Sequence, residues 1–176
     1  MANSRAAKSK CAIPNSDVAH DPFGEPCTLL QDHELMFLID TVTLSELRKR
    51  ERDPLVVKWF GRQRTSDLFL SVISIGEIER GITRQRTIDP NFATALADWL
   101  DKVLSIYGDR VVPFDLTAAR RWGALSAMLG NDSVDLMIAA TALENGLTVV
   151  TRNASDFEPT GVTVLDPFSR KPLGKR

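Results

Sequence analysis

Cysteine and histidine are scarce in this sequence, and neither occurs in most of it. The 176 residues include two of each, all within the first 33 positions: Cys11, His20, Cys27 and His33. If that stretch lies outside the folded part, the fold has no histidine base, Ser-His-Asp or Cys-His catalytic set, Cys/His zinc site or disulfide framework. Any catalysis there must use carboxylates, hydroxyls, Lys and Arg, or a hard metal ion.

Long apolar runs and a charge excess of one sign are also missing. The longest apolar stretches, such as 35–39 and 137–140, fall far short of the roughly 18 residues that a membrane helix needs. The stretch 11–26 is too polar and too rich in proline for a secretory signal, so we expect a soluble, cytoplasmic protein. With 22 basic and 23 acidic side chains, the chain is not a strongly basic nucleic-acid binder, although a local basic patch is compatible with these numbers.

The composition predicts one folded domain over residues 35–170. Residues 1–34 are rich in Asn, Ser, Asp, Pro and Gly and predict a disordered or loosely attached extension, and 171–176 predict a short tail. The Cys and His residues of the extension are separated by eight, six and five residues, which matches no compact pair of zinc ligands.

From residue 35 onward, short apolar runs alternate with helical patterns. This alternation is typical of an α/β fold with a central, mostly parallel sheet flanked by helices. The strands are expected at 35–39, 68–73, 111–112, 147–150 and 162–165. Helix starts are expected at two capping boxes, Thr43 with Glu46 and Ser74 with Glu77, and after four further N-cap residues, Asp53, Asp89, Asp115 and Ser133.

Four carboxylates stand at the ends of different predicted elements. Asp40 directly follows the first apolar strand, Glu77 and Asp135 lie in first turns of helices, and Asp156 follows the fourth strand. Parallel sheets place their ligand crevice at the carboxyl ends of strands, so these side chains can converge. Because like charges repel, a converging cluster implies a cation, and oxygen ligands without His or Cys favour Mg²⁺ or Mn²⁺.

Each of these carboxylates also has a simpler interpretation. Asp135 can complement the dipole of its helix, Glu77 can be the partner in the Ser74 capping box, and Asp156 can stabilise a turn. Residue placement alone therefore leaves the cluster as a hypothesis.

Several sequence motifs resemble one known family. The motifs are MFLIDT (36–41) with LSELR (44–48), SVISIGEI (71–78), DLMIAATAL (135–143), LTVVTRN (147–153) with DF (156–157), and VLDPF (164–168). In this order they resemble PIN-domain ribonucleases, in particular the VapC toxins of bacterial type II toxin-antitoxin systems. The family commonly has Asn after Asp-Thr, where this chain has Val42.

The resemblance implies a PIN-like domain that is a metal-dependent endoribonuclease. It makes Asp40, Glu77, Asp135 and Asp156 catalytic, with Asp40 and Asp135 as the principal ligands of Mg²⁺, or of Mn²⁺. Thr41, Thr151 and Asn153 are candidates to orient the carboxylates, and Arg80, Arg84 and Arg152 are candidates to bind RNA. It also implies a homodimer and a VapB-like antitoxin, with DNA bound only through the antitoxin.

Two other functions compete with this interpretation. An apolar strand that ends in Asp also begins haloacid-dehalogenase-like phosphatases, but their second Asp is replaced here by Val42. Alternatively, the chain is a catalytically weak PIN-fold protein that mainly binds an antitoxin and assists operator binding. Apolar residues between 44 and 60, including Trp59 and Phe60, form either a groove for such a partner or plain core.

Overall fold

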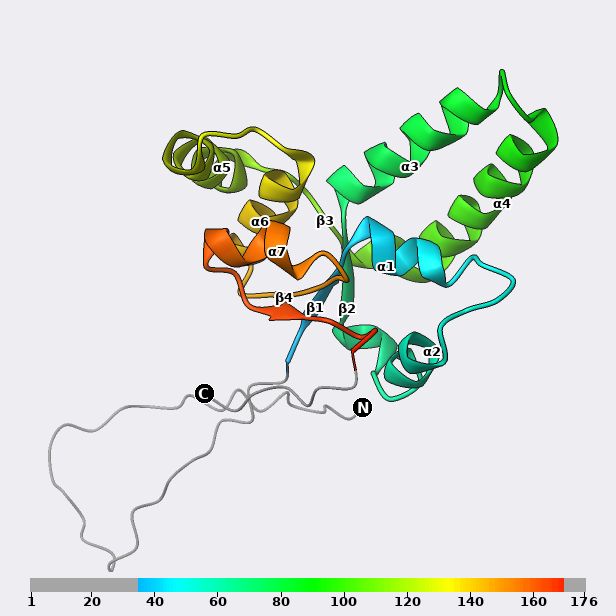
Figure 1. The fold of residues 1–176 in the computed structure, drawn as a ribbon, viewed down its shortest axis with the longest axis horizontal. Helices are drawn as coiled ribbons and strands as arrows, with labels where there is room; N and C mark the ends of the chain where they lie inside the picture. The colour runs from blue at the N-terminus through cyan, green and yellow to red at the C-terminus, as the bar shows by residue number, and fades with distance from the viewer. Residues whose placement is uncertain (1–34, 170–176) are drawn as a thin grey trace, which may run out of the picture. The chain divides into compact units, whose positions relative to one another are not determined.

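The computed structural model describes residues 35–169 (Figure 1). The predicted extension 1–34, with all its Cys and His residues, and the predicted tail 171–176 therefore lie outside the described residues. Across the part that is described, no helix is long and apolar enough to cross a membrane.

A five-stranded sheet forms the centre of this region. Its strands are β1 (Phe37–Ile39), β2 (Leu68–Ser71), β3 (Val111–Val112), β4 (Thr148–Val150) and β5 (Val164–Leu165). They are arranged in the order β3-β2-β1-β4-β5, and every neighbouring pair is parallel. The prediction of an α/β fold with a mostly parallel sheet is confirmed. Since all the carboxyl ends lie at one edge, the residues that follow β1, β2 and β4 are brought together there.

In the described part of the chain, seven α-helices connect and cover the strands. They are α1 (Thr41–Glu46), α2 (Pro54–Phe60), α3 (Val72–Gln85), α4 (Pro90–Tyr107), α5 (Leu116–Leu129), α6 (Val134–Glu144) and α7 (Ala154–Phe157). Short 3₁₀ turns lie at Thr65–Asp67, Gly108–Arg110 and Glu158–Thr160. The side chains of Asp53, Asp89, Asp115 and Ser133 cap α2, α4, α5 and α6, as predicted.

The two predicted capping boxes are wrong. The first helix begins three residues earlier than expected, because Asp40, directly after β1, caps it in place of Thr43 and accepts a hydrogen bond from the Thr41 amide. Likewise Ser71, at the end of β2, caps α3 through the Ile73 amide. In both cases the strand passes directly into the helix. The N-cap is therefore the residue just before the helix, Asp40 or Ser71, and not the Ser or Thr that stands three residues before a Glu. The short helix α7 was not predicted.

Alternate residues of the central strand point into two separate cores. Phe37 and Ile39 pack with residues of α1, α3 and α4 on one face of the sheet. Leu38 packs with residues of α6 and α7 on the other face. The result is a layered arrangement in which helices cover both faces (Figure 1). Burial on both faces explains why β1 is a continuous apolar run.

The apolar residues of the first two helices belong mainly to the core. Leu44 and Val56 are buried, and Trp59 packs edge-on against Phe37 and Phe60 at centroid distances of 5.2 and 5.0 Å. The interpretation as plain core therefore holds for Leu44, Val56, Trp59 and Phe60.

Candidate active site

Asp40 lies at the junction of β1 and α1 and is almost fully buried, with 2% of its surface exposed. One carboxylate oxygen, Oδ1, accepts a hydrogen bond of 2.7 Å from the Thr41 amide. The other, Oδ2, accepts one of 2.7 Å from the Thr151 hydroxyl. Both oxygens are thus held in fixed directions by the ends of two neighbouring strands.

Thr151 reaches Asp40 because β1 and β4 are adjacent and in register. Ile39 pairs with Val150, and the Asp40 amide donates to the Val150 carbonyl at 3.1 Å. The Thr151 hydroxyl also accepts a hydrogen bond of 3.0 Å from the Asn153 amide. Of the three residues predicted to orient the carboxylates, Asn153 therefore acts through its backbone, and its side chain makes no hydrogen bond among those seen in the described region.

Glu77 lies in the second turn of α3, half-buried. Its Oε2 accepts a hydrogen bond of 2.6 Å from the Thr41 hydroxyl, so Thr41 links Glu77 to the residue next to Asp40. The hydroxyl of Ser74, the residue expected to form a capping box with Glu77, is buried and has no hydrogen-bond partner among residues 35–169. The side chain of Glu77 is thus turned toward Asp40 and not toward its own helix start.

The remaining two carboxylates come from α6 and α7. Asp135 is half-buried in the first turn of α6, and Asp156 is exposed on α7. Asp135 lies within electrostatic range of Asp40, Glu77 and Asp156. The structure therefore brings together all four carboxylates that the sequence singled out, from four separate segments.

Burial and mutual repulsion disfavour the charged forms of two of these groups. Burial raises the pKa of Asp40 from 3.8 to about 6, against the hydrogen bonds from Thr151 and Thr41, and repulsion from Asp135 and Glu77 adds to the rise. The pKa of Asp135 is also raised, by burial first and then by repulsion from Asp156 and Glu77. A cation at this place would relieve both effects.

The donor chemistry of the cluster fits a hard divalent ion. Every functional side chain in it offers oxygen, which suits Mg²⁺ or Mn²⁺. Within residues 35–169, no three carboxylates are gathered tightly enough to form a complete ligand set. Mg²⁺ does not need one, because it retains several waters and is often held by one or two carboxylates. Asp40 is buried, ionisable and faced by other carboxylates, so such an ion would stabilise its ionised form more than that of the other three.

The three predicted RNA-binding arginines differ in their surroundings. Arg80 and Arg84 are exposed on α3, beyond Glu77. Arg152 instead has partners within the chain: its Nη2 lies 3.7 Å from Glu46 Oε2, and its guanidinium lies over the ring of Phe168 at 4.1 Å from the centroid.

Glu46 is a buried carboxylate whose importance the sequence did not reveal. It is 4% exposed, accepts a hydrogen bond of 3.0 Å from the Asp53 amide, and lies 2.6 Å from Lys49 Nζ. These partners and Arg152 lower its pKa, with the hydrogen bond from Lys49 as the largest cause. The sequence alone predicts only the contact with Lys49, because oppositely charged residues three apart are neighbours on a helix. The contacts with Asp53 and Arg152 depend on the fold.

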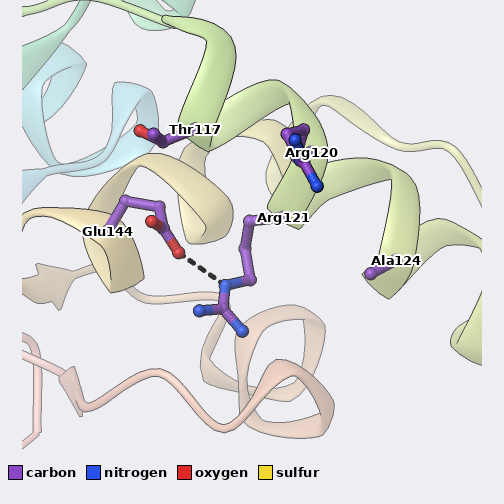
Figure 2. Close-up of a pocket in the computed structure, with 5 residues that line it drawn as sticks. All are labelled: Thr117, Arg120, Arg121, Ala124 and Glu144. Atoms are coloured by element: carbon purple, nitrogen blue, oxygen red, sulfur yellow. Dashed lines mark hydrogen bonds and ion pairs between the residues drawn. The ribbon is translucent and has the colours of Figure 1, made fainter.

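A hollow lies between α5 and α6 (Figure 2). Its lining residues are Thr117, Arg120, Arg121, Ala124 and Glu144. Arg121 Nε lies 2.6 Å from Glu144 Oε1. None of the predicted site residues lines this hollow, so it is not part of the candidate active site.

Comparison with known proteins identifies the family of this chain. Residues 37–160 match the model of the PIN domain family. The chain belongs to the PIN-domain family. Among relatives of this PIN-domain protein, the plasmid stability protein StbB of Pseudomonas syringae pv. tomato is 33% identical over 144 residues, which cover 76% of this chain and 99% of StbB. A VapC ribonuclease of Sinorhizobium fredii is 34% identical, over 76% of this chain and 98% of its own length.

Solved structures give the same result for the PIN-domain protein. The FitAcB structure from Neisseria gonorrhoeae superposes with a TM-score of 0.68 at 28% identity, covering 76% of this chain and 99% of the other. The DNA-bound VapBC structure from Salmonella typhimurium gives a TM-score of 0.60 at 26% identity, covering 76% and 98%. The resemblance to VapC-type toxins is confirmed, and the chain falls in a family of toxin ribonucleases.

Proposed function

We propose that this PIN-domain protein is a divalent-metal-dependent endoribonuclease, and that it acts in the cytoplasm as the toxin of a toxin-antitoxin pair. The observation that carries the proposal is the meeting of Asp40, Glu77, Asp135 and Asp156 at one end of the sheet, with Asp40 buried among like charges. Such a cluster is costly without a cation and suits phosphodiester hydrolysis with one.

Each residue of the cluster has a distinct part in this proposal. Asp40 and Asp135 would hold Mg²⁺, or Mn²⁺, Glu77 would act on it directly or through water, and Asp156 would complete the acidic pocket. When bound, the ion supplies positive charge that makes water a better nucleophile and stabilises the developing charge on the phosphate.

The surrounding hydroxyls fix the directions of the carboxylates. Thr151 donates to Asp40, and Thr41 donates to Glu77, so that each carboxylate keeps one oxygen in a defined place. The exposed guanidinium groups of Arg80 and Arg84 would contact RNA phosphates beside the pocket.

Cleavage of a mixed-sequence single-stranded RNA tests the proposal. The wild-type chain is expected to cleave it with Mg²⁺ or Mn²⁺ and not with EDTA, and the variant Asp40→Asn is expected to be inactive although folded. The exposed Asp98 on α4 provides the matched control, since Asp98→Asn removes the same charge outside the cluster. Metal-dependent cleavage by Asp40→Asn would overturn the assignment of the site.

We also propose that the chain is a homodimer and binds a small VapB-like antitoxin, with DNA contacted only through that partner. Support for a partner comes from the similarity to the VapBC structure from Salmonella typhimurium, which is DNA bound, and to the FitAcB structure. The homodimer is what the family resemblance implies. Co-expression with the product of a neighbouring short reading frame, followed by light scattering and a cleavage assay, checks complex formation and inhibition.

The alternative function, a catalytically weak PIN-fold protein that mainly binds an antitoxin and assists operator binding, has one observation in its favour. The VapBC structure from Salmonella typhimurium, at 26% identity to this chain, is DNA bound. Absence of cleavage by the pure wild-type chain with either ion, together with tight antitoxin binding, would favour this alternative.

A further inference from the structure

Arg152 joins three segments that are far apart in the sequence. It lies in the loop between β4 and α7, directly after Thr151. Its guanidinium is 3.7 Å from the Glu46 carboxylate at the end of α1 and is stacked on Phe168, beyond β5, at 4.1 Å. The loop contains both Thr151, which donates the hydrogen bond to Asp40, and Arg152, which attaches the loop to two other parts of the fold.

The same loop holds both ends of α1. At the start of this helix, Thr151 donates to Asp40. At its end, Arg152 meets Glu46. Because α1 spans only six residues, these two contacts fix its position and direction relative to the loop. The loop then runs into α7, which carries Asp156, so the attachment also limits where Asp156 can lie.

We propose that Arg152 and Glu46 form a positioning pair, which holds the loop between β4 and α7 against α1 and so keeps Asp40 and Asp156 in the arrangement needed for RNA cleavage. This inference rests on the proposed function of the same site. It gives Arg152 a different role from RNA binding, the role that the sequence suggested.

The energetics of the pair favour positioning over stabilisation. The Arg152 side chain is half exposed, and ion pairs of this kind contribute little to the free energy of unfolding. Glu46 keeps two other partners when Arg152 is removed, the Lys49 ammonium and the Asp53 amide. The variant Arg152→Gln is therefore expected to fold, with the loop released from α1.

The chain offers a closely matched control. Lys49 contacts the same Glu46 carboxylate at the shorter distance of 2.6 Å, but from the same segment as α1. The variant Lys49→Gln thus removes an ion pair with Glu46 without releasing the loop. A role of Glu46 in local stability predicts an effect of Lys49→Gln, whereas positioning through Arg152 predicts none.

The experiment compares Arg152→Gln, Glu46→Gln, the double variant and Lys49→Gln. Each of the first two is expected to lower kcat for single-stranded RNA and the affinity for Mn²⁺, measured by calorimetry, by about two- to fivefold, with KM changed by less than about 1.5-fold, because a half-exposed ion pair contributes only a small free energy. The double variant is expected to resemble the single variants, because they break the same contact. Amide hydrogen exchange over residues 151–157 should become faster in all three, and Lys49→Gln should behave like wild type.

Two results would overturn the positioning role. If Arg152→Gln raises KM and weakens its salt dependence while Glu46→Gln leaves kcat unchanged, Arg152 contacts RNA directly. If Lys49→Gln lowers kcat as much as Glu46→Gln, the effect is a general one on α1.

Two further measurements keep the test independent of folding and of RNA cleavage. Should Glu46→Gln not fold, Phe168→Leu releases the other side of Arg152 and is expected to accelerate exchange over the same residues. Should the wild-type chain cleave no RNA with any divalent ion, the proposed function fails, and the exchange rates alone decide whether the pair holds the loop. Unchanged exchange in Arg152→Gln overturns the inference in either case.

Discussion

Asp40 combines three structural roles in one side chain. It ends the central strand, caps α1 and presents a carboxylate in a nearly fully buried place. An Asn in its place could still cap the helix, because the amide oxygen accepts the same hydrogen bond. The charge of Asp40 is therefore not required by the local fold. It is present despite the cost of burial, which is the main physical reason to assign it a role in chemistry.

The pKa of Asp40 predicts how pH affects stability without metal. Because that pKa is about 6 in the folded chain and 3.8 is its ordinary value, ionisation costs the folded state about 3 kcal/mol at most. The neutral carboxyl group therefore stabilises the folded state relative to the ionised one. This stabilisation is complete below pH 3.8 and is lost as pH rises through about 6. We expect the free energy of unfolding, measured by denaturant titration in EDTA, to fall over this pH range. Asp40→Asn should flatten this pH profile and be the more stable protein at pH 7.5; an unchanged profile would contradict the burial argument.

The hydroxyl of Thr151 gives a second prediction at the residue scale. Thr151→Val keeps the shape of the side chain but leaves Asp40 Oδ2 without this donor, at a cost of about 1–3 kcal/mol in unfolding free energy at neutral pH. Cleavage should fall roughly 10–100-fold, because the carboxylate is no longer held. Thr148→Val, at the start of β4, serves as the control, because Thr148 is buried like Thr151 but is not a partner of Asp40. Equal rates of RNA cleavage by the two variants would show that the hydrogen bond from Thr151 to Asp40 has no role in cleavage.

Among the helices, α6 is the most enclosed. Leu136, Ile138, Ala139, Ala140 and Ala142 are all buried, so the helix is covered around most of its circumference. Its small residues let α5 and the sheet approach closely. This close packing holds Asp135 at the start of α6 near the other carboxylates.

Enlarging a small residue of α6 should therefore be costly. Ala139→Leu inserts three carbons into a filled core and is expected to lower the free energy of unfolding by about 1–3 kcal/mol. Ala127→Leu, at an exposed position of α5, is expected to stay within about 0.5 kcal/mol of wild type. Denaturant unfolding of both variants checks the contrast, and similar values for the two would mean that α6 is less tightly enclosed than described.

The elements also show what the sequence could and could not predict. Strands β1 and β4 and the capped starts of α2, α4, α5 and α6 follow from local patterns, and so does the placement of Asp40, Asp135 and Asp156 at element ends. Glu77 was predicted in a first helical turn and lies in the second, because α3 begins earlier than expected. The starts of α1 and α3 were missed because the strand-end residues Asp40 and Ser71 act as caps. The pairing of Glu46 with Arg152 was not predictable, because it joins residues that only the sheet order brings together.

At the scale of the whole molecule, a bound divalent ion should stabilise the fold. An ion that binds only the folded chain adds about 2.7 kcal/mol at a concentration of 100 times its Kd. We expect the unfolding temperature to rise with Mg²⁺ or Mn²⁺ in the wild type and in Asp98→Asn, and to stay constant in Asp40→Asn. Calorimetric scans at increasing ion concentration measure this shift. A rise of equal size in Asp40→Asn would place the ion elsewhere.

The contact between Asp40 and Thr151 spans 111 positions of the chain. During synthesis, the first carboxylate therefore leaves the ribosome long before Asp135, Thr151 and Asp156 exist. The central strand can pair with β2 early, but its other neighbour, β4, is made much later. A nascent chain thus has no assembled carboxylate cluster until β4 and α7 have left the ribosome. If the chain cleaves RNA as proposed, this order of assembly delays its activity until these two elements have been made and have folded onto the rest of the sheet.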